Sequence, residues 1–336
     1  MQPDMAQIVE RIFHRRSEQP SVPSVLTVEQ LNQRYLQGET LHPGQLAKIL
    51  HVLSRNEADY YRKIISQRQA GFWQKWAPFR ESPAGTTDEY GNAIPVFEDV
   101  MKVLGGVREQ FAKAVSPKEG EFIVDLMGGS AQMAEPIMDA MWERDTLAGY
   151  ASIDGNEFAV NKAEITLQSL PIPQHIPHYS LQHDLSQGTL PEGLEDLIQK
   201  AYPTALRFIS SWGISYLDME RLTRLVDSCY ALVPDVPAMV DILMLTGGKF
   251  DRNVLTRRFL TNIVPKNALA GNFGELGMAM MALPHMRKFG EEIAEVNPIW
   301  TPDEIRVELE ERGYMTEIVD DNILWGQSTA MRIKEK

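Results

Sequence analysis

The chain has 336 residues, of which 43% are hydrophobic and 24% charged, as in ordinary globular proteins. Its formal net charge of −13 argues against a broad basic surface for nucleic acid, because phosphate binding rests on Lys and Arg. One cysteine, Cys229, leaves no intrachain disulfide and no thiolate metal site. We expect a cytoplasmic protein without a secretory leader or membrane span, because the N-terminus lacks an apolar stretch and no run approaches about 18 apolar residues.

Residues 1–117 are predicted to form a helical N-terminal domain that caps the rest of the protein. Apolar residues recur there at helical spacing, most clearly over 57–76. Tyr60, Tyr61 and Trp73 belong to this stretch and are candidates for lining a ligand pocket. Aromatic residues at helical spacing are more often part of a core, so both interpretations stay open.

From residue 118 onward, short apolar runs alternate with helical patterns. We expect strands near 122–127, 149–154, 177–182, 206–212 and 238–245, and helices near 131–144, 157–170, 191–201 and 218–230. Such alternation predicts parallel strands joined by crossover helices, the arrangement of an α/β fold.

The C-terminal part follows an irregular segment at about 247–300. Thr301 as helix cap, with proline next and glutamate three residues later, predicts a helix that stops at Gly313. Two extended runs then follow, 314–319 and 323–332, and the polar joint between them predicts an antiparallel hairpin.

Two of the expected strand ends carry the most informative chemistry. One apolar run contains Asp125 near its end and is followed by Gly128 and Gly129, and the next run ends on Asp154. Glycine permits a tight turn and a close backbone approach to a ligand. An acid after the second strand of an α/β sheet is placed to accept hydrogen bonds from a ribose. The two ends therefore predict a nucleoside-bearing cofactor.

These features resemble the class I S-adenosylmethionine-dependent methyltransferases, over roughly residues 118–246 and 301–336. The first motif of that family is a strand, an acid and a glycine-rich turn, represented here by 124–131. Met127 stands where the family often has its first glycine, and Ala131 where it often has its last. The two glycines between them are therefore expected to provide the close approach to the cofactor.

The resemblance also implies individual cofactor contacts. Asp154 would hold both ribose hydroxyls, Asp184 the adenine amine with the Leu185 backbone alongside, and the strand end at 208–217 would face the transferred methyl group. Asp154 can also be a plain helix cap, and Asp184 a surface turn residue. The cofactor-binding residues that the resemblance implies are Asp125, Gly128, Gly129, Ser130, Asp154, Gly155, Asn156, Asp184, Leu185, Ser210 and Trp212.

The fold that the resemblance implies is an α/β fold with a Rossmann-like, seven-stranded sheet, mostly parallel and with an antiparallel last strand. The expected domains are a helical N-terminal cap or dimerisation domain at 1–117 and a methyltransferase domain at 118–336. The segment at about 247–300 would be a substrate-cap insertion. The resemblance also implies that the N-terminal helices can form a homodimer.

The activity implied is methyl transfer from S-adenosylmethionine, with S-adenosylhomocysteine as product, to an O, N or C atom of a small organic molecule. Such a transfer needs mainly positioning and a dry pocket, and we expect no metal. Tyr216, just past the fourth strand, and His285, whose type titrates near neutrality, are candidate catalytic residues. Arg257 is a candidate for binding a substrate carboxylate. A lone histidine such as His285 is more often structural, and for Arg257 a solvated surface charge is the favoured interpretation.

Three alternatives stay open. A methyltransferase acting on a protein or nucleic acid is disfavoured by the acidic charge and the large cap. A nicotinamide-dependent oxidoreductase is disfavoured because the sequence has no G-x-G-x-x-G motif. A non-enzymatic scaffold would explain Met127 and Ala131 as relics of a lost site.

Overall fold

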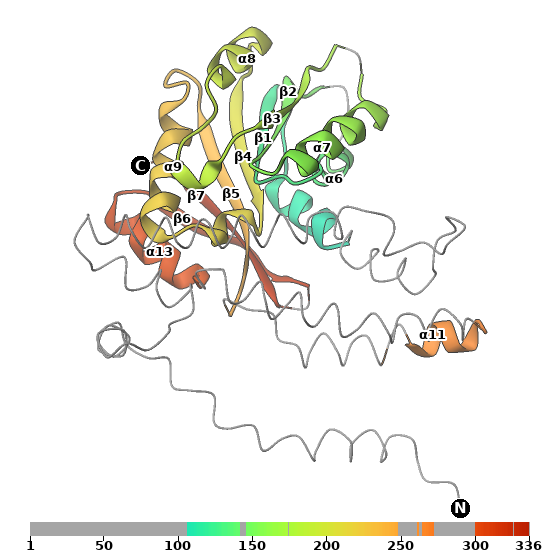
Figure 1. The fold of residues 1–336 in the computed structure, drawn as a ribbon. Helices are drawn as coiled ribbons and strands as arrows, with labels where there is room; N and C mark the ends of the chain where they lie inside the picture. Colours follow the sequence, from blue (N-terminus) through green and yellow to red (C-terminus); the bar gives the residue numbers. More distant parts are fainter. Residues whose placement is uncertain are drawn as a thin grey trace, which may run out of the picture. The chain divides into compact units, whose positions relative to one another are not determined.

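The protein was analysed as a computed structural model, drawn in Figure 1. The residues that the structure describes are 106–141, 146–173, 175–247, 261, 264–271, 300–324 and 326–335. The expected cap helices of the first 105 residues, and most of the expected insertion at about 247–300, lie outside them. Residues 106–115 are helical and fall within the N-terminal part, 1–117, that is expected to be helical.

The described part of the chain is built on one seven-stranded sheet with the order β3-β2-β1-β4-β5-β7-β6. The first five strands pair in parallel, and β7 runs antiparallel to both β5 and β6. The strands are β1 (Glu121–Leu126), β2 (Gly149–Asp154), β3 (His178–Gln182), β4 (Ala205–Ser211), β5 (Ala238–Leu245), β6 (Met315–Ile323) and β7 (Ser328–Lys334). This is the mostly parallel sheet with a reversed last strand that the sequence leads us to expect.

Helices cover both faces of the sheet, as Figure 1 shows for α8 and α9 on one side and α6 and α7 on the other. The helical elements are α6 (Ala134–Asp139), α7 (Glu157–Ser169), η3 (Leu185–Gln187), α8 (Leu194–Ala201), η4 (Gly213–Tyr216), α9 (Met219–Ala231), α11 (Val264–Leu269) and α13 (Pro302–Glu311). The strands expected from apolar runs are all present. Helix α6 is shorter than expected.

Alternation along β1 divides the core into two layers. Phe122, Val124 and Leu126 pack in the cluster that includes α8, α9 and α13, whereas Ile123 packs in the cluster that includes α6 and α7. All residues of β1 are buried, because parallel strands between two helical layers have no solvent-facing side. The carboxyl ends of these strands are thereby held at fixed positions.

Helix α13 begins as its sequence predicts. The Thr301 side chain accepts from the backbone N–H of Glu304, and the Glu304 side chain accepts from the backbone N–H of Thr301, which completes a capping box. The chain leaves the helix through Gly313, whose φ of 99° is accessible to glycine at little cost.

The hairpin is present, but the joint predicted at 320–322 is wrong. Strand β6 runs through these polar residues, and the chain reverses at 324–327, where the N–H of Gln327 bonds to the carbonyl of Leu324 at 3.2 Å. Leu324 and Gly326 have φ values of 51° and 76°, the left-handed backbone that a tight turn requires. Polar residues fit within β6 because it is the edge strand, and its pairing with β7 is irregular around Asp320.

A buried network of ion pairs joins side chains of the four strands β1, β4, β5 and β7. Arg207, 1% exposed, donates to both carboxylate oxygens of Glu121, at 2.6 and 3.2 Å, and to Asp241 at 2.8 Å. Arg332 donates to the other oxygen of Asp241 at 2.7 Å and to the carbonyl of Val115 at 2.8 Å. The network links β1, β4, β5 and β7 and fixes their register.

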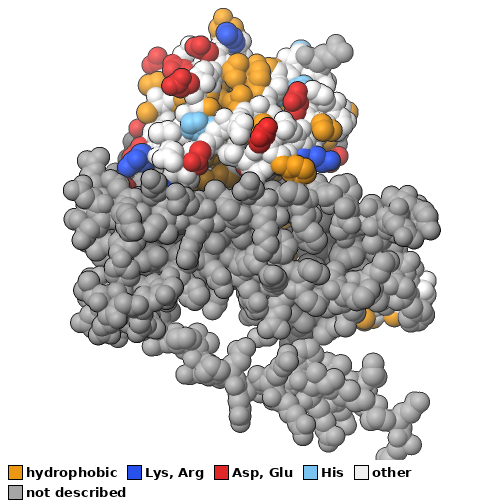
Figure 2. Space-filling view, in the orientation of Figure 1, with side chains coloured by type: hydrophobic (Ala, Val, Ile, Leu, Met, Phe, Trp, Pro, Cys, Tyr) orange, Lys and Arg blue, Asp and Glu red, His pale blue; other side chains and the backbone are white. Residues whose placement is uncertain are grey.

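The surface of the described part matches the acidic composition. On the face drawn in Figure 2, acidic side chains are dispersed and the basic side chains of the described residues do not gather into a patch. Among the helices of the described ranges, none is both long and apolar enough to cross a membrane.

Candidate functional site

The turn after β1 has three residues with left-handed backbone, although two of the three have side chains. Met127, Gly129 and Ala131 have φ values of 56°, 57° and 58°. Left-handed backbone costs a residue with a side chain about 1–3 kcal/mol and is found mainly where a site requires it. Met127 and Ala131 thus adopt a backbone conformation that is ordinarily left to glycine.

Gly128, the second residue of this turn, lies tightly on the strands beneath it. A Cβ at Gly128 would come within 2.5 Å of Ser152 Oγ and 2.7 Å of Asp125 Oδ2. Its backbone N–H donates to the carbonyl of Ile153 at 3.1 Å, which ties the turn to β2. Only glycine permits this close approach without a shift of the neighbours.

Asp125 lies buried beneath the turn, fully shielded from solvent. Tyr150 donates its hydroxyl to Asp125 Oδ2 at 2.8 Å, and Asp125 Oδ1 and Ser152 Oγ have no hydrogen-bond partner within the described residues. Burial raises the pKa of Asp125 to about 7, against the hydrogen bond from Tyr150 and the charge of Arg108, and with a further increase from Asp154. Asp125 therefore changes its charge near neutral pH, directly under the turn.

Asp154 stands at the carboxyl end of β2 and is held by two backbone donors. Its Oδ2 accepts from the N–H of Gly129 at 3.0 Å, and its Oδ1 accepts from the N–H of Asn156 at 2.8 Å. Asn156 in turn caps α7 by accepting from Ala159 at 3.1 Å, so Asp154 is not the helix cap. A carboxylate oxygen can accept more than one hydrogen bond, so these two backbone contacts are compatible with a further donor such as a ribose hydroxyl.

The end of β3 lies beside this acid. The N–H of His183 donates to the carbonyl of Asp154 at 3.0 Å, and the exposed Gly155 lies within 3.5 Å, measured from a Cβ built on it, of the Asp184 backbone. Asp184 accepts from the backbone of Ser186 at 3.0 Å and caps the short helix η3, as a turn residue would.

The environment of Asp184 keeps it ionised. Burial alone would raise its pKa, but hydrogen bonds from Ser186 and Gln187 and the nearby charge of Arg221 hold the pKa below its usual value. Leu185, next in the chain, is buried. The structure therefore brings Asp154, Gly155 and Asp184 to one edge, where the backbones of β2 and β3 end together.

The turn after β4 is also held in an unusual conformation. Trp212 has a φ of 64°, and its indole N–H donates to Ser328 Oγ of β7 at 3.1 Å. The buried Ser210 accepts from the N–H of Ile214 at 3.0 Å. Tyr216 lies in the short helix η4 that follows, and its side chain is outside the described residues.

Ser130 is buried in the turn after β1. The structure adds Arg108 to the residues near this turn: its guanidinium donates to the side chain of Gln132. The sequence analysis missed Arg108 because it lies in the helix before β1, 24 residues away along the chain, and no local pattern indicates the contact. It brings a positive charge near the buried Asp125.

Five candidate residues lie outside the described part of the chain. These are the candidate catalytic residue His285 and the candidate substrate-binding residues Tyr60, Tyr61, Trp73 and Arg257. Within the described ranges, no group of three or more His, Cys, Asp or Glu side chains is placed to hold a metal ion.

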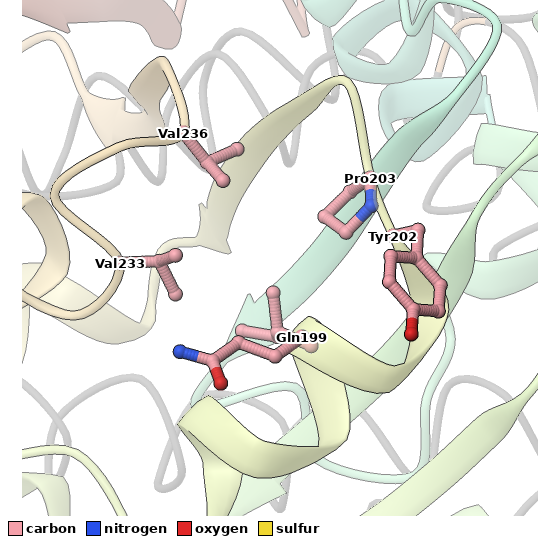
Figure 3. Close-up of a pocket in the computed structure, with 6 residues that line it drawn as sticks. Gln199, Tyr202, Pro203, Val233 and Val236 are labelled. Carbon is pink, nitrogen blue, oxygen red and sulfur yellow. The ribbon is translucent and has the colours of Figure 1, made fainter.

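A shallow apolar groove of about 400 Å³ lies at the amino ends of β4 and β5, whereas the turns described above follow the carboxyl ends of the strands. Figure 3 shows its lining, formed by Gln199, Tyr202 and Pro203 before β4 and by Val233 and Val236 before β5. Because it lies at the amino ends of the strands, it is separate from the turns after β1, β2 and β4.

Comparison with known proteins gives no matching family model and no matching curated protein. A SAM-dependent methyltransferase from Aquifex aeolicus is similar over 67% of this chain and 88% of its own, with 13% identity and a TM-score of 0.41. The plantazolicin methyltransferase, solved with SAH, is similar over 92% and 98%, with 11% identity and a TM-score of 0.40. A small RNA methyltransferase is similar over 68% of this chain but 25% of its own, with 11% identity and a TM-score of 0.42.

These proteins are what the chain is similar to, and their substrates differ. The strand order β3-β2-β1-β4-β5-β7-β6, with an antiparallel β7, is the arrangement that the sequence resemblance implies. The described sheet has the class I methyltransferase fold.

Proposed function

We propose that the protein transfers a methyl group from S-adenosylmethionine to a small organic molecule. The observation that carries this proposal is the carboxylate of Asp154, which is fixed by the N–H groups of Gly129 and Asn156 at the end of β2. A carboxylate so oriented offers both of its oxygens to the two hydroxyls of an adenosyl ribose. The glycine at 128 lets the backbone of the neighbouring turn approach the rest of the cofactor.

The residues of this edge fit the proposed cofactor. In this proposal Asp184, which lies beside Asp154, contacts the adenine, and the adjacent turn at 127–131 binds the amino-acid part. S-adenosylmethionine, when bound, supplies a methyl group on a positively charged sulfur. The protein's own contribution is to bind, to orient and to exclude water, and such positioning accounts for much of the rate enhancement of a displacement reaction.

A small-molecule acceptor is favoured by the dispersed acidic surface and by the length of chain available for a cap. In this proposal Tyr216 and His285 act on the acceptor, and Tyr60, Tyr61, Trp73 and Arg257 line its pocket. The N-terminal helices would then form the cap and a homodimer contact, and the protein would act in the cytoplasm.

The cofactor part is tested by calorimetric titration of the full chain with S-adenosylhomocysteine and, separately, with NADH. We expect binding of S-adenosylhomocysteine alone, and a loss of about 1–3 kcal/mol in Asp154→Asn, because hydrogen bonds to a charged group are removed. Asp196→Asn, at an exposed position of α8, is the matched control and should bind as the unaltered protein does. Binding of NADH instead, or an unchanged Asp154→Asn, would contradict the proposal.

The acceptor class is tested with methyl-labelled S-adenosylmethionine and a cell extract divided by ultrafiltration. We expect label in the small-molecule filtrate and none in the retained protein and nucleic acid. Label confined to the retained fraction would show that the acceptor is a macromolecule.

A further inference from the structure

The strand order of this sheet reverses between β1 and β4, and a ligand is expected at the carboxyl ends of these two strands. From β1 the chain moves through β2 to β3 on one side, and it then returns to place β4 and β5 on the other. The helices after β1 and β4 also go to opposite faces: α6 packs in one cluster and α9 in the other. In open α/β sheets, ligands bind at such a reversal, beyond the carboxyl ends of the strands.

The side chain of Met127 lies between the turns that follow β1 and β4. It follows β1, is half-buried, and lies directly on the backbone of Gly213, which follows β4. A Cβ built at Gly213 would be 2.4 Å from Met127 Cβ and 3.3 Å from Met127 Cγ. Gly213 therefore provides the space that Met127 occupies, and a larger residue there would push Met127 away from β4.

Both sides of this contact are held in place. The residues after Met127 are bonded to β2 through the N–H groups of Gly128 and Gly129. The turn before Gly213 is bonded to β5 through the N–H of Trp212, at 2.9 Å from the carbonyl of Leu243, and to β7 through its indole. Met127 is thus fixed between two anchored turns, in a left-handed conformation that costs free energy.

We propose that Met127 determines which alkyl group the donor can carry, by forming the floor under the donor sulfur and limiting the space for its substituent to a methyl group. The inference rests on the proposed function, since it concerns the same cofactor. Asp154 lies on the β2 side of the turn and would hold the ribose, whereas Met127 extends to the β4 side, where the reacting end of the donor would lie. A thioether side chain is apolar and polarisable and suits contact with a sulfonium.

The experiment compares the affinities of S-adenosylmethionine and its S-allyl analogue for the full chain and three variants. The quantity measured is the ratio of the two dissociation constants. We expect the unaltered protein to favour the methyl donor about tenfold or more, the discrimination typical of a pocket that excludes extra carbon atoms. Met127→Ala should bring the ratio close to one, and Met127→Leu, of similar volume, should retain it.

Gly213→Ala provides a second test, in which Met127 itself is unaltered. Its added methyl group would push Met127 away from β4 and so from the reacting end of the donor, and we expect the ratio to fall toward one. Alanine at 127 is compatible with the fold, because Ala131 already has a φ of 58° in the same turn. Circular dichroism of each variant confirms that the affinities refer to folded protein.

The outcomes separate this inference from the proposed function. Equal affinity losses for both donors in Met127→Ala, with an unchanged ratio, would show that Met127 only supports the turn and would overturn the inference, as would a ratio near one in the unaltered protein. In both cases the cofactor assignment stands. Failure of the unaltered protein to bind either donor or S-adenosylhomocysteine would remove the proposed function itself.

Discussion

The buried carboxyl of Asp125 makes the stability of the protein depend on pH in a direction that can be calculated. Its pKa in the folded protein is raised from 3.8 to about 7, chiefly by burial. The folded state therefore binds a proton that the unfolded state has released between pH 4 and pH 7. The stabilisation is fully present below pH 4. It falls by about 1.4 kcal/mol per pH unit between pH 4 and pH 7, and it is lost once the pH has risen through 7.

Asp125→Asn removes this titration while keeping a similar side-chain shape and an acceptor for Tyr150. The full shift corresponds to about 4 kcal/mol, of which about 3 kcal/mol falls between pH 5 and pH 8. We expect the free energy of unfolding of Asp125→Asn, relative to the unaltered protein, to increase by this amount over that interval. Urea unfolding at pH 5, 6, 7 and 8, with both proteins in the same buffers, measures the difference and cancels the titration of other groups.

Tyr150→Phe is the companion variant. The hydroxyl of Tyr150 favours the ionised form of Asp125, so its removal should raise the pKa of Asp125 further and move the loss of stability to higher pH. Parallel stability curves for Asp125→Asn and the unaltered protein from pH 5 to pH 8 would refute the reasoning, because Asp125 would then titrate alike in the folded and unfolded states.

Two further predictions concern packing and buried charge. Gly128→Ala should lower the free energy of unfolding by about 1–3 kcal/mol, the usual cost of overpacking, and a change below about 0.5 kcal/mol in urea unfolding would mean that the turn can move off the strands. Arg207→Met should cost about 3–5 kcal/mol by leaving the buried Glu121 without its partner and Asp241 with Arg332 alone. Arg207→Lys, which keeps the charge but not the forked geometry, should lose less stability in the same urea unfolding measurements, and an equal loss in both variants would count against a role for the charge.

The strands of the sheet could be predicted because their residues form uninterrupted apolar runs bounded by turn residues. Every residue of β1 is buried, and such a strand needs no alternating pattern to be recognised. The joint of the hairpin could not be predicted, because polar residues in an edge strand have the same composition as a turn. The reversal depends on left-handed backbone at Leu324, a type of residue that does not indicate it.

The parts of the site that consist of neighbouring residues in the sequence could be predicted. Asp154 and the turn after β1 belong to one motif each, and the structure brings them together through a 3.0 Å hydrogen bond. The sequence could not indicate whether Met127 would adopt a left-handed φ, as a glycine readily does. That depends on its contact with Gly213, which lies far along the chain. The same holds for Arg108, whose proximity to the turn is set by helix packing.

The place of β7 inside the sheet has a consequence for the order of assembly. β6 pairs only with β7 among the strands that the structure describes, although β6 comes first along the chain. It can therefore join the sheet only once β7 has docked on β5, with Arg332 reaching Asp241. The last two strands therefore join the sheet in the reverse of their order in the chain. A chain that ended before β7 would leave the hydrogen-bonding edge of β5 unpaired and prone to aggregation.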